Sequence, residues 1–450
     1  MGQTNRLFQR PGPPAELLIR NAHVLDPRTD LDAPHDVLLR AGRIAELGSA
    51  GSLSAAEDGE TIDAAGRYLL PGFVDPHVHL RTPGQEHKED LDTGTAAAAA
   101  GGFCAVIAMP NTDPVLDDAA VLRSLADAAA RQARVPVGFL AAITRNLGGQ
   151  ELTEMAELRD AGALGFTDDG KPVVSGGTLR KALQYQRLCG GVIALHEEDP
   201  DLSRDGAMHE GAVSARLGIA GIPSLSESTM VARDAALAAY EDARVHFQHL
   251  SCVESVEALR HAKLAGARVS AEVCPHHLTL TDEEVRTLDS RFKMNPPLRT
   301  EADREALIAA LRSGLIDTVA TDHAPHASHE KEVPFEEAPM GTTGLETAFA
   351  ALYTELVAPG ELDLATLVAR MTEGAALYGL PVPMIAPDHP ANLTLIDLNA
   401  RFEVGAGGYA SRSSNCCFDG RVLQGKVLLT VAAGTVAFRT RMLAEALAIR

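Results

Sequence analysis

The sequence predicts an α/β protein: a (β/α)8 TIM barrel with a small composite β-sandwich domain formed by the N- and C-terminal segments. The first observation is that short apolar runs alternate with alanine-rich helical stretches over residues 69–385, which is typical of a parallel sheet. The second is their number, since eight such runs suit a closed barrel. The third is that the flanking segments, 15–68 and 386–440, are both strand-like.

Segment 15–68 is assigned to the N-terminal part of the β domain. It contains aliphatic and β-branched runs, such as those in ELLIRNAHVLDP and HDVLLRAGRIAELG, which Asn, Asp and Gly separate. Segment 386–440 has the same character in ANLTLIDLNARFEV and FDGRVLQGKVLLTVAAGTVAFRT. Because these strands flank the barrel on both sides, we expect them to pair with one another in one domain.

The barrel is assigned to residues 69–385. Helical stretches such as DDAAVLRSLADAAARQA and CVESVEALRHAKLAG separate its apolar runs. An open doubly wound sheet is the structural alternative, but no G-x-G-x-x-G follows an early strand. The eight runs are LLPGFVDPHVHL, GFCAVIAMP, VPVGFLAAIT, ALGFTDDG, GVIALHEED, RVHFQHLS, ARVSAEVCPHH and DTVATDHAPH.

Charge and composition exclude several function classes. The 450 residues include 61 acidic and 40 basic side chains, a net charge of −21, which disfavours nucleic acid and anionic membrane surfaces as partners. No apolar stretch reaches the about 18 residues of a membrane span, and MGQTNRLFQRPGPP lacks the apolar region of a secretory signal. The six cysteines are sparse and form no CxxC pair. We therefore expect a cytoplasmic protein with free, buried thiols.

Histidine and aspartate side chains stand at the ends of five apolar runs. In a barrel of this kind the carboxyl ends of the strands form one mouth, where active sites lie. Ligand-type side chains from several strands at that mouth predict a metal centre. The residues are His77 and His79, Asp168 or Asp169, His196, His249, and Asp322.

The spacing of these residues decides some assignments and leaves others open. His77 and His79 are two apart on a strand, so both side chains point to the same face. His246 competes with His249 but lies three residues earlier, on the opposite face and deeper in the strand. Asp322 could cap a helix, but the HAPH that follows favours a site loop. Nitrogen and carboxylate donors favour Zn2+, while Mn2+, Co2+ and Fe2+ also fit.

Nine motifs in order identify a family resemblance that covers about residues 15–438. The sequence resembles the cyclic amidohydrolases and, within them, the class I dihydroorotase family, in which an aspartate bridges the metals. The motifs are PGFVDPHVHLRTPG, MPNT, GFTDDG, LHEED, QHLS, CPHHL, KMNPPLR, TDHAPH and GLETAF.

The resemblance implies one or two Zn2+ ions per subunit, with two favoured. It favours Asp169 over Asp168 as the bridging ligand, whereas related hydantoinases and allantoinases have a carboxylated lysine there. The implied metal ligands are His77, His79, Asp169, His196, His249 and Asp322. The implied contacts to the substrate are Arg81, Asn111, Asn295, His326, Met340 and Gly341.

The implied reaction is the reversible hydrolysis of (S)-dihydroorotate to N-carbamoyl-L-aspartate in pyrimidine (UMP) biosynthesis. A metal-activated hydroxide would attack the ring amide, with Asp322 as general acid and base. Arg81 is expected to reverse the negative field locally for the substrate carboxylate. The segment 326–340 is either a mobile lid or an ordinary surface loop.

Two alternatives to this reading differ in function class. The first is another cyclic amidohydrolase, an allantoinase or hydantoinase, against which Asp169 argues. The second is a non-catalytic partner of aspartate transcarbamoylase, against which the complete ligand set argues. The partners to consider are therefore a small-molecule substrate, a second copy of the chain in a homodimer, and aspartate transcarbamoylase.

Overall fold

The protein is described by a computed structural model that covers residues 7–55, 59–441 and 443. Its central element is an eight-stranded sheet in which every pairing is parallel. Each of the eight predicted apolar runs contains one of its strands, which confirms the barrel. In chain order they are β6 (Phe73–Val78), β7 (Phe103–Ala108), β8 (Val137–Ala141), β9 (Gly165–Phe166), β10 (Ile193–Leu195), β13 (Val245–Phe247), β14 (Val269–Val273) and β15 (Thr318–Val319).

The barrel closes between its first and last strands, β6 and β15. Val78 forms a parallel bridge with His323, and the backbone N–H of His79 donates to the carbonyl of His323 at 2.9 Å. The closing contact therefore lies at the carboxyl ends of both strands, next to the predicted ligands His79 and Asp322.

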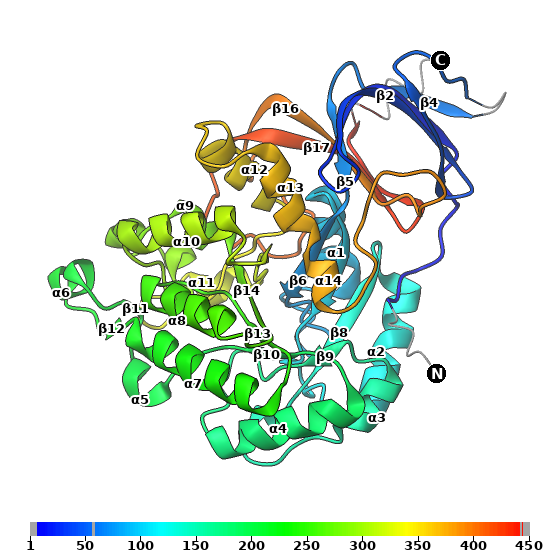
Figure 1. The fold of residues 1–450 in the computed structure, drawn as a ribbon. Coiled ribbons are helices and arrows are strands. Elements are labelled where there is room, and N and C mark those ends of the chain that lie inside the picture. The colour runs from blue at the N-terminus through cyan, green and yellow to red at the C-terminus, as the bar shows by residue number, and fades with distance from the viewer. Residues whose placement is uncertain (1–6, 56–58, 442, 444–450) are drawn as a thin grey trace.

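Helices pack round the outside of the barrel (Figure 1), and from α1 to α10 each long helix contacts the next one along the chain. Local capping explains where several begin: Asp118 accepts from the N–H groups that start α2, and Thr300 forms a capping box that starts α10. The long helices are α1 (Leu91–Ala100), α2 (Ala119–Gln132), α3 (Met155–Ala161), α4 (Gly176–Cys189), α7 (Leu225–Glu241), α8 (Val253–Leu264), α10 (Glu301–Ser313) and α13 (Leu364–Thr372).

Shorter elements lie mostly in the connections. They are α5 (Pro200–Ser203), α6 (Ala212–Leu217), α9 (Pro275–Thr279), α11 (Ser328–Lys331), α12 (Ala348–Leu352) and α14 (Gly374–Leu377), the paired strands β11 (Met208–His209) and β12 (Gly221–Ile222), and the turns of helix η1 (Arg145–Leu147), η2 (Asp282–Thr287), η3 (Ser290–Phe292) and η4 (Tyr353–Val357). No helix within the described ranges is long and apolar enough to cross a membrane.

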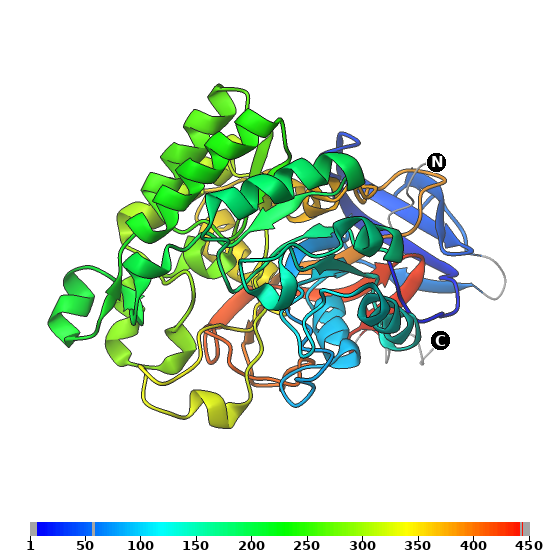
Figure 2. The same cartoon turned by 90° about the horizontal axis from the view of Figure 1, so that it is seen from below.

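The second eight-stranded sheet combines both ends of the chain, as expected, and lies beside the barrel (Figure 1; Figure 2). Its strands form one hydrogen-bonded path, β18-β17-β16-β5-β1-β2-β3, with β4 paired to β1. The N-terminal strands are β1 (Leu17–Asp26), β2 (Leu31–Arg40), β3 (Arg43–Ser49), β4 (Glu60–Asp63) and β5 (Tyr68–Pro71), and the C-terminal strands are β16 (Leu393–Glu403), β17 (Val422–Ala432) and β18 (Thr435–Arg439).

Gly72 is the point at which the chain passes from this sheet into the barrel, between β5 and β6. A Cβ atom there would lie 2.7 Å from the Cβ of Cys104, so only glycine fits the close approach. Below it, Phe73 stacks on Phe349 with ring centroids 5.4 Å apart. The N–H of Gly72 also donates to the carbonyl of Asn392, the residue before β16, at 2.9 Å, which joins the composite sheet to the start of the first barrel strand.

The segment between β16 and β17 returns from the composite sheet to the barrel mouth. There Glu89, which is fully buried, accepts hydrogen bonds from the Ser411 hydroxyl and the Arg412 N–H, and lies 3.3 Å from Nε2 of His323. The C-terminal part of the chain therefore helps to hold the residue that follows Asp322. All six cysteines are buried and free, in agreement with the expectation from the sequence.

Candidate active site

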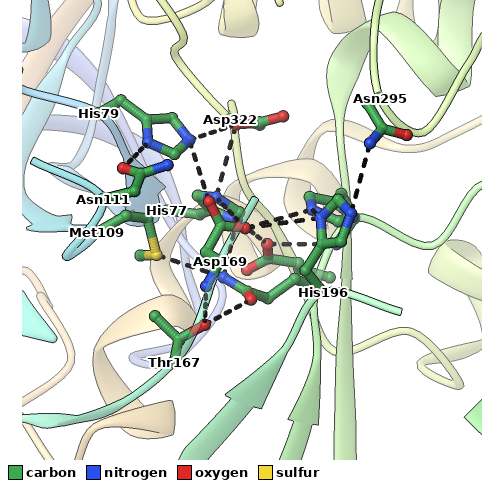
Figure 3. Close-up of polar contacts among 12 residues, drawn as sticks. His77, His79, Met109, Asn111, Thr167, Asp169, His196, Asn295 and Asp322 are labelled. Carbon is green, nitrogen blue, oxygen red and sulfur yellow. Dashed lines mark hydrogen bonds and ion pairs between the residues drawn. The ribbon is translucent and has the colours of Figure 1, made fainter. Parts of the chain in front are cut away.

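Six predicted ligand side chains meet at the carboxyl ends of the barrel strands, and all of them except His249 are labelled in Figure 3. Five of them are buried, and the side chain of Asp322 is 14 % exposed. His77 lies in β6 and His79 directly after it, and the others follow β9, β10, β13 and β15 in turn: Asp169, His196, His249 and Asp322.

Asp169 lies at the centre of this cluster. Its Oδ1 is 3.4 Å from Nε2 of His77, 3.6 Å from Nε2 of His249 and 3.8 Å from Nδ1 of His196. Its Oδ2 is 3.4 Å from Nε2 of His79. One carboxylate thus faces four imidazole nitrogens, an arrangement suited to bridging two positions.

The remaining contacts divide the cluster into two groups that share Asp169. Asp322 Oδ1 lies 3.0 Å from Nε2 of His79 and 3.5 Å from Nε2 of His77. On the other side, Nδ1 of His196 lies 3.0 Å from Nε2 of His249. Two trios of residues each have one donor atom per residue within 4.8 Å of the others. The first trio is His77, His79 and Asp322, and the second is His77, Asp169 and His249.

Backbone conformation helps to aim these side chains. Arg81, His249 and Asp322 have φ angles of 57°, 31° and 48°, in the left-handed region that side-chain-bearing residues seldom adopt. All three follow strand ends at the mouth. Such conformations persist where the surrounding structure imposes them, which is common at functional sites.

The structure shows which residue of each alternative pair, Asp168 or Asp169 and His246 or His249, faces the cluster. Asp168 points away from the cluster and accepts from the N–H of Ile143 at 2.8 Å and from the N–H and hydroxyl of Thr144. Asp169 alone of the pair faces the histidines. His246 likewise points elsewhere, with Nδ1 2.9 Å from the Ser270 hydroxyl.

Three acceptors orient the imidazoles from behind. Nδ1 of His77 lies 2.6 Å from Oε1 of Glu272, Nδ1 of His79 lies 2.9 Å from Oδ1 of Asn111, and Nε2 of His196 lies 3.1 Å from Oε2 of Glu198. In each ring the other nitrogen is left for the cluster, the arrangement that orients metal-ligating histidines.

Two of these acceptors, Glu272 and Glu198, were not predicted from the sequence. Glu272 was detectable as the one ionisable residue in β14, whose sequence is VSAEV, because an unpaired charge in a buried strand is costly. Glu198 lies two residues after His196 in LHEED, and nothing in its spacing distinguishes it from its acidic neighbours. Asn111 was expected to contact substrate and also turns out to hold His79.

A metal ion fits the cluster on the geometry of its donors. Among the described residues, His77 Nε2 and Asp169 Oδ1 are buried at its centre without a hydrogen-bond partner. Burial lowers the pKa of His77, but the carboxylates of Asp169, Glu272 and Asp322 more than reverse this and raise it. The centre thus has a field that attracts positive charge, and its nitrogen and oxygen donors suit zinc and similar divalent ions.

A cavity of about 240 Å3 opens above the cluster. Arg81 is fixed at its wall because its Nε donates to the carbonyl of Pro325 at 3.2 Å. Nε2 of His326 lies 2.9 Å from the carbonyl of Met340 and therefore carries the proton of that contact. All six residues expected to contact substrate line this cavity: Arg81, Asn111, Asn295, His326, Met340 and Gly341.

The segment 326–340 is tied down at several points. Lys331 is buried, and its Nζ donates to the carbonyls of Pro339 at 2.9 Å and Gly341 at 3.1 Å. Asn415, from the returning C-terminal segment, donates to the same Gly341 carbonyl and accepts from the N–H of His326 at 3.0 Å. These contacts join the segment to Gly341 in the cavity wall and to the returning C-terminal segment.

Positive charge gathers on this side of the cavity. Burial, together with the charge of Lys293, lowers the pKa of Lys331 to about 8, so it is a cation at neutral pH. Burial and the cations Arg81, Lys331 and Lys88 lower the pKa of His326 to about 3, so its imidazole is neutral. Arg81 and Lys331 therefore provide a local field suited to an anion within a strongly acidic protein.

The fold and the site define a barrel hydrolase of the class to which the hydantoinases belong. The chain is similar to the solved L-hydantoinase from Arthrobacter aurescens, with a TM-score of 0.84, 27% identity, and 94% of this chain and 96% of that one covered. It is also similar to the dihydropyrimidinase from Brevibacillus agri, with a TM-score of 0.81, 25% identity, and 94% and 95% coverage.

The sequence comparisons define the family more closely. Residues 66–257 match the family model described as Dihydro-orotase-like. The dihydroorotase from Pelotomaculum thermopropionicum is 44% identical over 429 residues, which are 95% of this chain and 100% of the relative. The dihydroorotase from Acetivibrio thermocellus is 42% identical over 428 residues, with the same coverage. The chain belongs to the dihydroorotase family.

Proposed function

We propose that the protein catalyses the reversible hydrolysis of (S)-dihydroorotate to N-carbamoyl-L-aspartate in pyrimidine biosynthesis. The observation that carries this proposal is the central position of Asp169, whose own carboxylate faces four imidazoles beside an arginine-lined cavity. The names and full-length coverage of the relatives support the same reaction.

The proposed cofactor is Zn2+, with two ions per subunit favoured. An ion in this position, when bound, polarises the ring carbonyl and lowers the pKa of bound water. The residues proposed to hold the metals are His77 and His79 with Asp322 on one side, His196 and His249 on the other, and Asp169 between them.

Asp322 is proposed to move the proton of the reaction. Burial raises its pKa, but the imidazoles of His77, His79 and His249 hold the pKa below its ordinary value, so Asp322 is an ionised acceptor. As a water oxygen adds to the ring amide carbon, Asp322 takes a proton from that water and then gives it to the ring nitrogen as the C–N bond breaks. In ring closure the same residue takes the proton from the attacking nitrogen.

The cavity residues are proposed to bind the substrate. Arg81 can pair with its carboxylate in a two-point contact, since the Nε contact to Pro325 sets the orientation of the guanidinium plane. Asn111, Asn295 and His326 supply polar contacts round the ring, and Met340 and Gly341 supply backbone atoms.

An assay of ring closure tests this function. Purified, zinc-loaded protein should convert N-carbamoyl-L-aspartate to dihydroorotate, and a chelator should abolish turnover. Turnover of hydantoin or allantoin in place of dihydroorotate would identify another cyclic amidohydrolase. A zinc-loaded protein without turnover of any of the three would instead support the non-catalytic role.

We propose a cytoplasmic enzyme that acts on a small molecule, with neither nucleic acid nor membrane as partner, as the net charge of −21 suggests. A homodimer and association with aspartate transcarbamoylase are both proposed as assemblies. Sedimentation of the protein alone, and then mixed with that transferase, tests each of them.

A further inference from the structure

One carboxylate oxygen joins the metal cluster to the substrate cavity. Oε2 of Glu198 lies 3.1 Å from Nε2 of His196 and accepts a hydrogen bond from Nδ2 of Asn295 at 2.7 Å. Those two nitrogens are themselves 3.5 Å apart, as the line between Asn295 and His196 in Figure 3 marks. The same oxygen of Glu198 therefore contacts a proposed metal ligand, His196, and a proposed substrate-binding residue, Asn295.

The chemistry of an ionised carboxylate fixes the orientation of both partners. Because the Glu198 carboxylate can only accept a hydrogen bond, His196 must carry its proton on Nε2. The lone pair of Nδ1 is then left for the cluster. That Nδ1 is the atom 3.0 Å from Nε2 of His249. In Asn295 the amide nitrogen must face Glu198, so Oδ1 is the atom that remains free to accept from a substrate N–H.

The backbone on both sides of Glu198 is held in place. β10 ends at Leu195, one residue before His196. On the other side, the N–H of Asp199 donates to the Ser226 carbonyl at 2.8 Å, and the Asp199 side chain caps α5. The Glu198 side chain is only 19 % exposed, so water competes little for its hydrogen bonds.

We propose that Glu198 is a positioning residue that fixes the tautomer of His196 and the amide orientation of Asn295. It thereby links metal affinity on the His196–His249 side of the cluster to substrate affinity in the cavity. The substrate half of this inference rests on the proposed function, whereas the metal half is measurable without turnover.

The test uses variants at Glu198 and Asn295, prepared metal-free and reloaded with zinc. In Glu198→Ala both contacts are lost. In Glu198→Gln the amide oxygen can occupy the position of Oε2 and accept from both partners. Glu257→Ala removes a carboxylate that is 52 % exposed on α8 and serves as the matched control. Zinc affinity is measured by competition with a chromophoric chelator. KM and kcat are measured in the ring-closure assay.

For the metal readout, Glu198→Ala should lose roughly 10- to 100-fold in zinc affinity at one of the two positions. Asn295→Ala, Glu198→Gln and the Glu257→Ala control should retain wild-type affinity. Unchanged zinc affinity in Glu198→Ala overturns the proposal. Should Glu198→Ala fail to fold, Glu198→Asp takes its place, since it keeps the charge but withdraws the oxygen by one methylene group.

For the substrate readout, Glu198→Ala should raise KM roughly 10-fold, and Asn295→Ala should raise it at least as much. The Glu198→Ala/Asn295→Ala double variant should match Asn295→Ala, because Glu198 acts on the substrate through Asn295. If the increases in KM of the two single variants multiply in the double variant, Glu198 does not act on the substrate through Asn295, and the substrate part of the proposal is overturned. A wild-type protein that loads zinc but does not turn over would refute the proposed function alone, and the zinc affinities would still decide the role of Glu198 toward His196.

Discussion

Oδ1 of Asp322 lies 3.0 Å from Nε2 of His79, although the two residues come from opposite ends of the barrel sequence. The contact exists because β6 and β15 close the barrel through the bridge between Val78 and His323. The proposed proton carrier is therefore positioned by the same contact that completes the fold.

Replacing Asp322 with Ala or Asn should lower kcat by about 10^3-fold or more, because the carboxylate proposed to carry the proton is removed. The fold should survive, since the Asp322 side chain is partly exposed and mainly contacts the cluster. Turnover and far-UV circular dichroism measure the two effects. Asp127→Ala, at an exposed position on α2, is the control. Near-normal turnover in Asp322→Asn would reassign the proton transfer to another group.

Replacing Arg81 with Met should raise KM for N-carbamoyl-L-aspartate by at least about 10-fold, because a charge-assisted contact to its carboxylate is lost. The effect on kcat should be smaller. Arg81→Lys keeps the charge without the planar fork and should be intermediate. Arg123→Met, at an exposed position on α2, is the control. Unchanged KM in Arg81→Met would remove Arg81 from the substrate site.

Metal removal and reloading should not depend on carbon dioxide, because the proposed bridging group is the side-chain carboxylate of Asp169 itself, which faces His77 and His79. Metal-free protein reloaded with zinc in carbon dioxide-free buffer should regain its full metal content and turnover. Added bicarbonate should change neither. Asp169→Ala should lose metal under both conditions. A requirement for bicarbonate in the wild type would mean that a carbamylated group completes the site.

The pH dependence of stability should reflect Lys331, whose pKa burial lowers from 10.5 to about 8. Between these values the unfolded chain binds the proton and the folded chain releases it, so this residue makes the free energy of unfolding rise with pH. The expected rise from pH 8 to pH 10 is about 2 kcal/mol. Urea unfolding of Lys331→Met should lack that increment relative to wild type. Equal pH slopes in the two proteins would contradict the buried cation.

The strand ends of the barrel were predictable from the sequence because they combine two local signals. An apolar run marks a buried strand, and the polar residue after it marks the mouth, as at His196 and His249. The i, i+2 spacing of His77 and His79 adds a shared face. Strand alternation did not separate Asp168 from Asp169, because β9 spans only Gly165–Phe166 and both aspartates lie beyond it.

The supporting contacts were not predictable, because they join segments far apart in the sequence. Glu272 meets His77 across 195 positions, and Asn415 meets His326 across 89. No local period encodes such pairs, which depend on how β14 and the returning C-terminal segment pack against the barrel. The composite sheet was predictable as a pairing of both termini, but its register, such as Leu69 opposite Leu395, was not.

The pairing of β5 with β16 also sets the order in which the protein can fold as it is synthesised. β5 ends at Pro71 and its partner begins at Leu393, so roughly 320 residues separate the two strands. At about 5–20 residues per second, a ribosome needs about 16–64 s to deliver that partner. During this interval the nascent chain presents an unpaired strand edge, a surface prone to aggregation. We expect newly made chains to depend on chaperones until β16–β18 emerge.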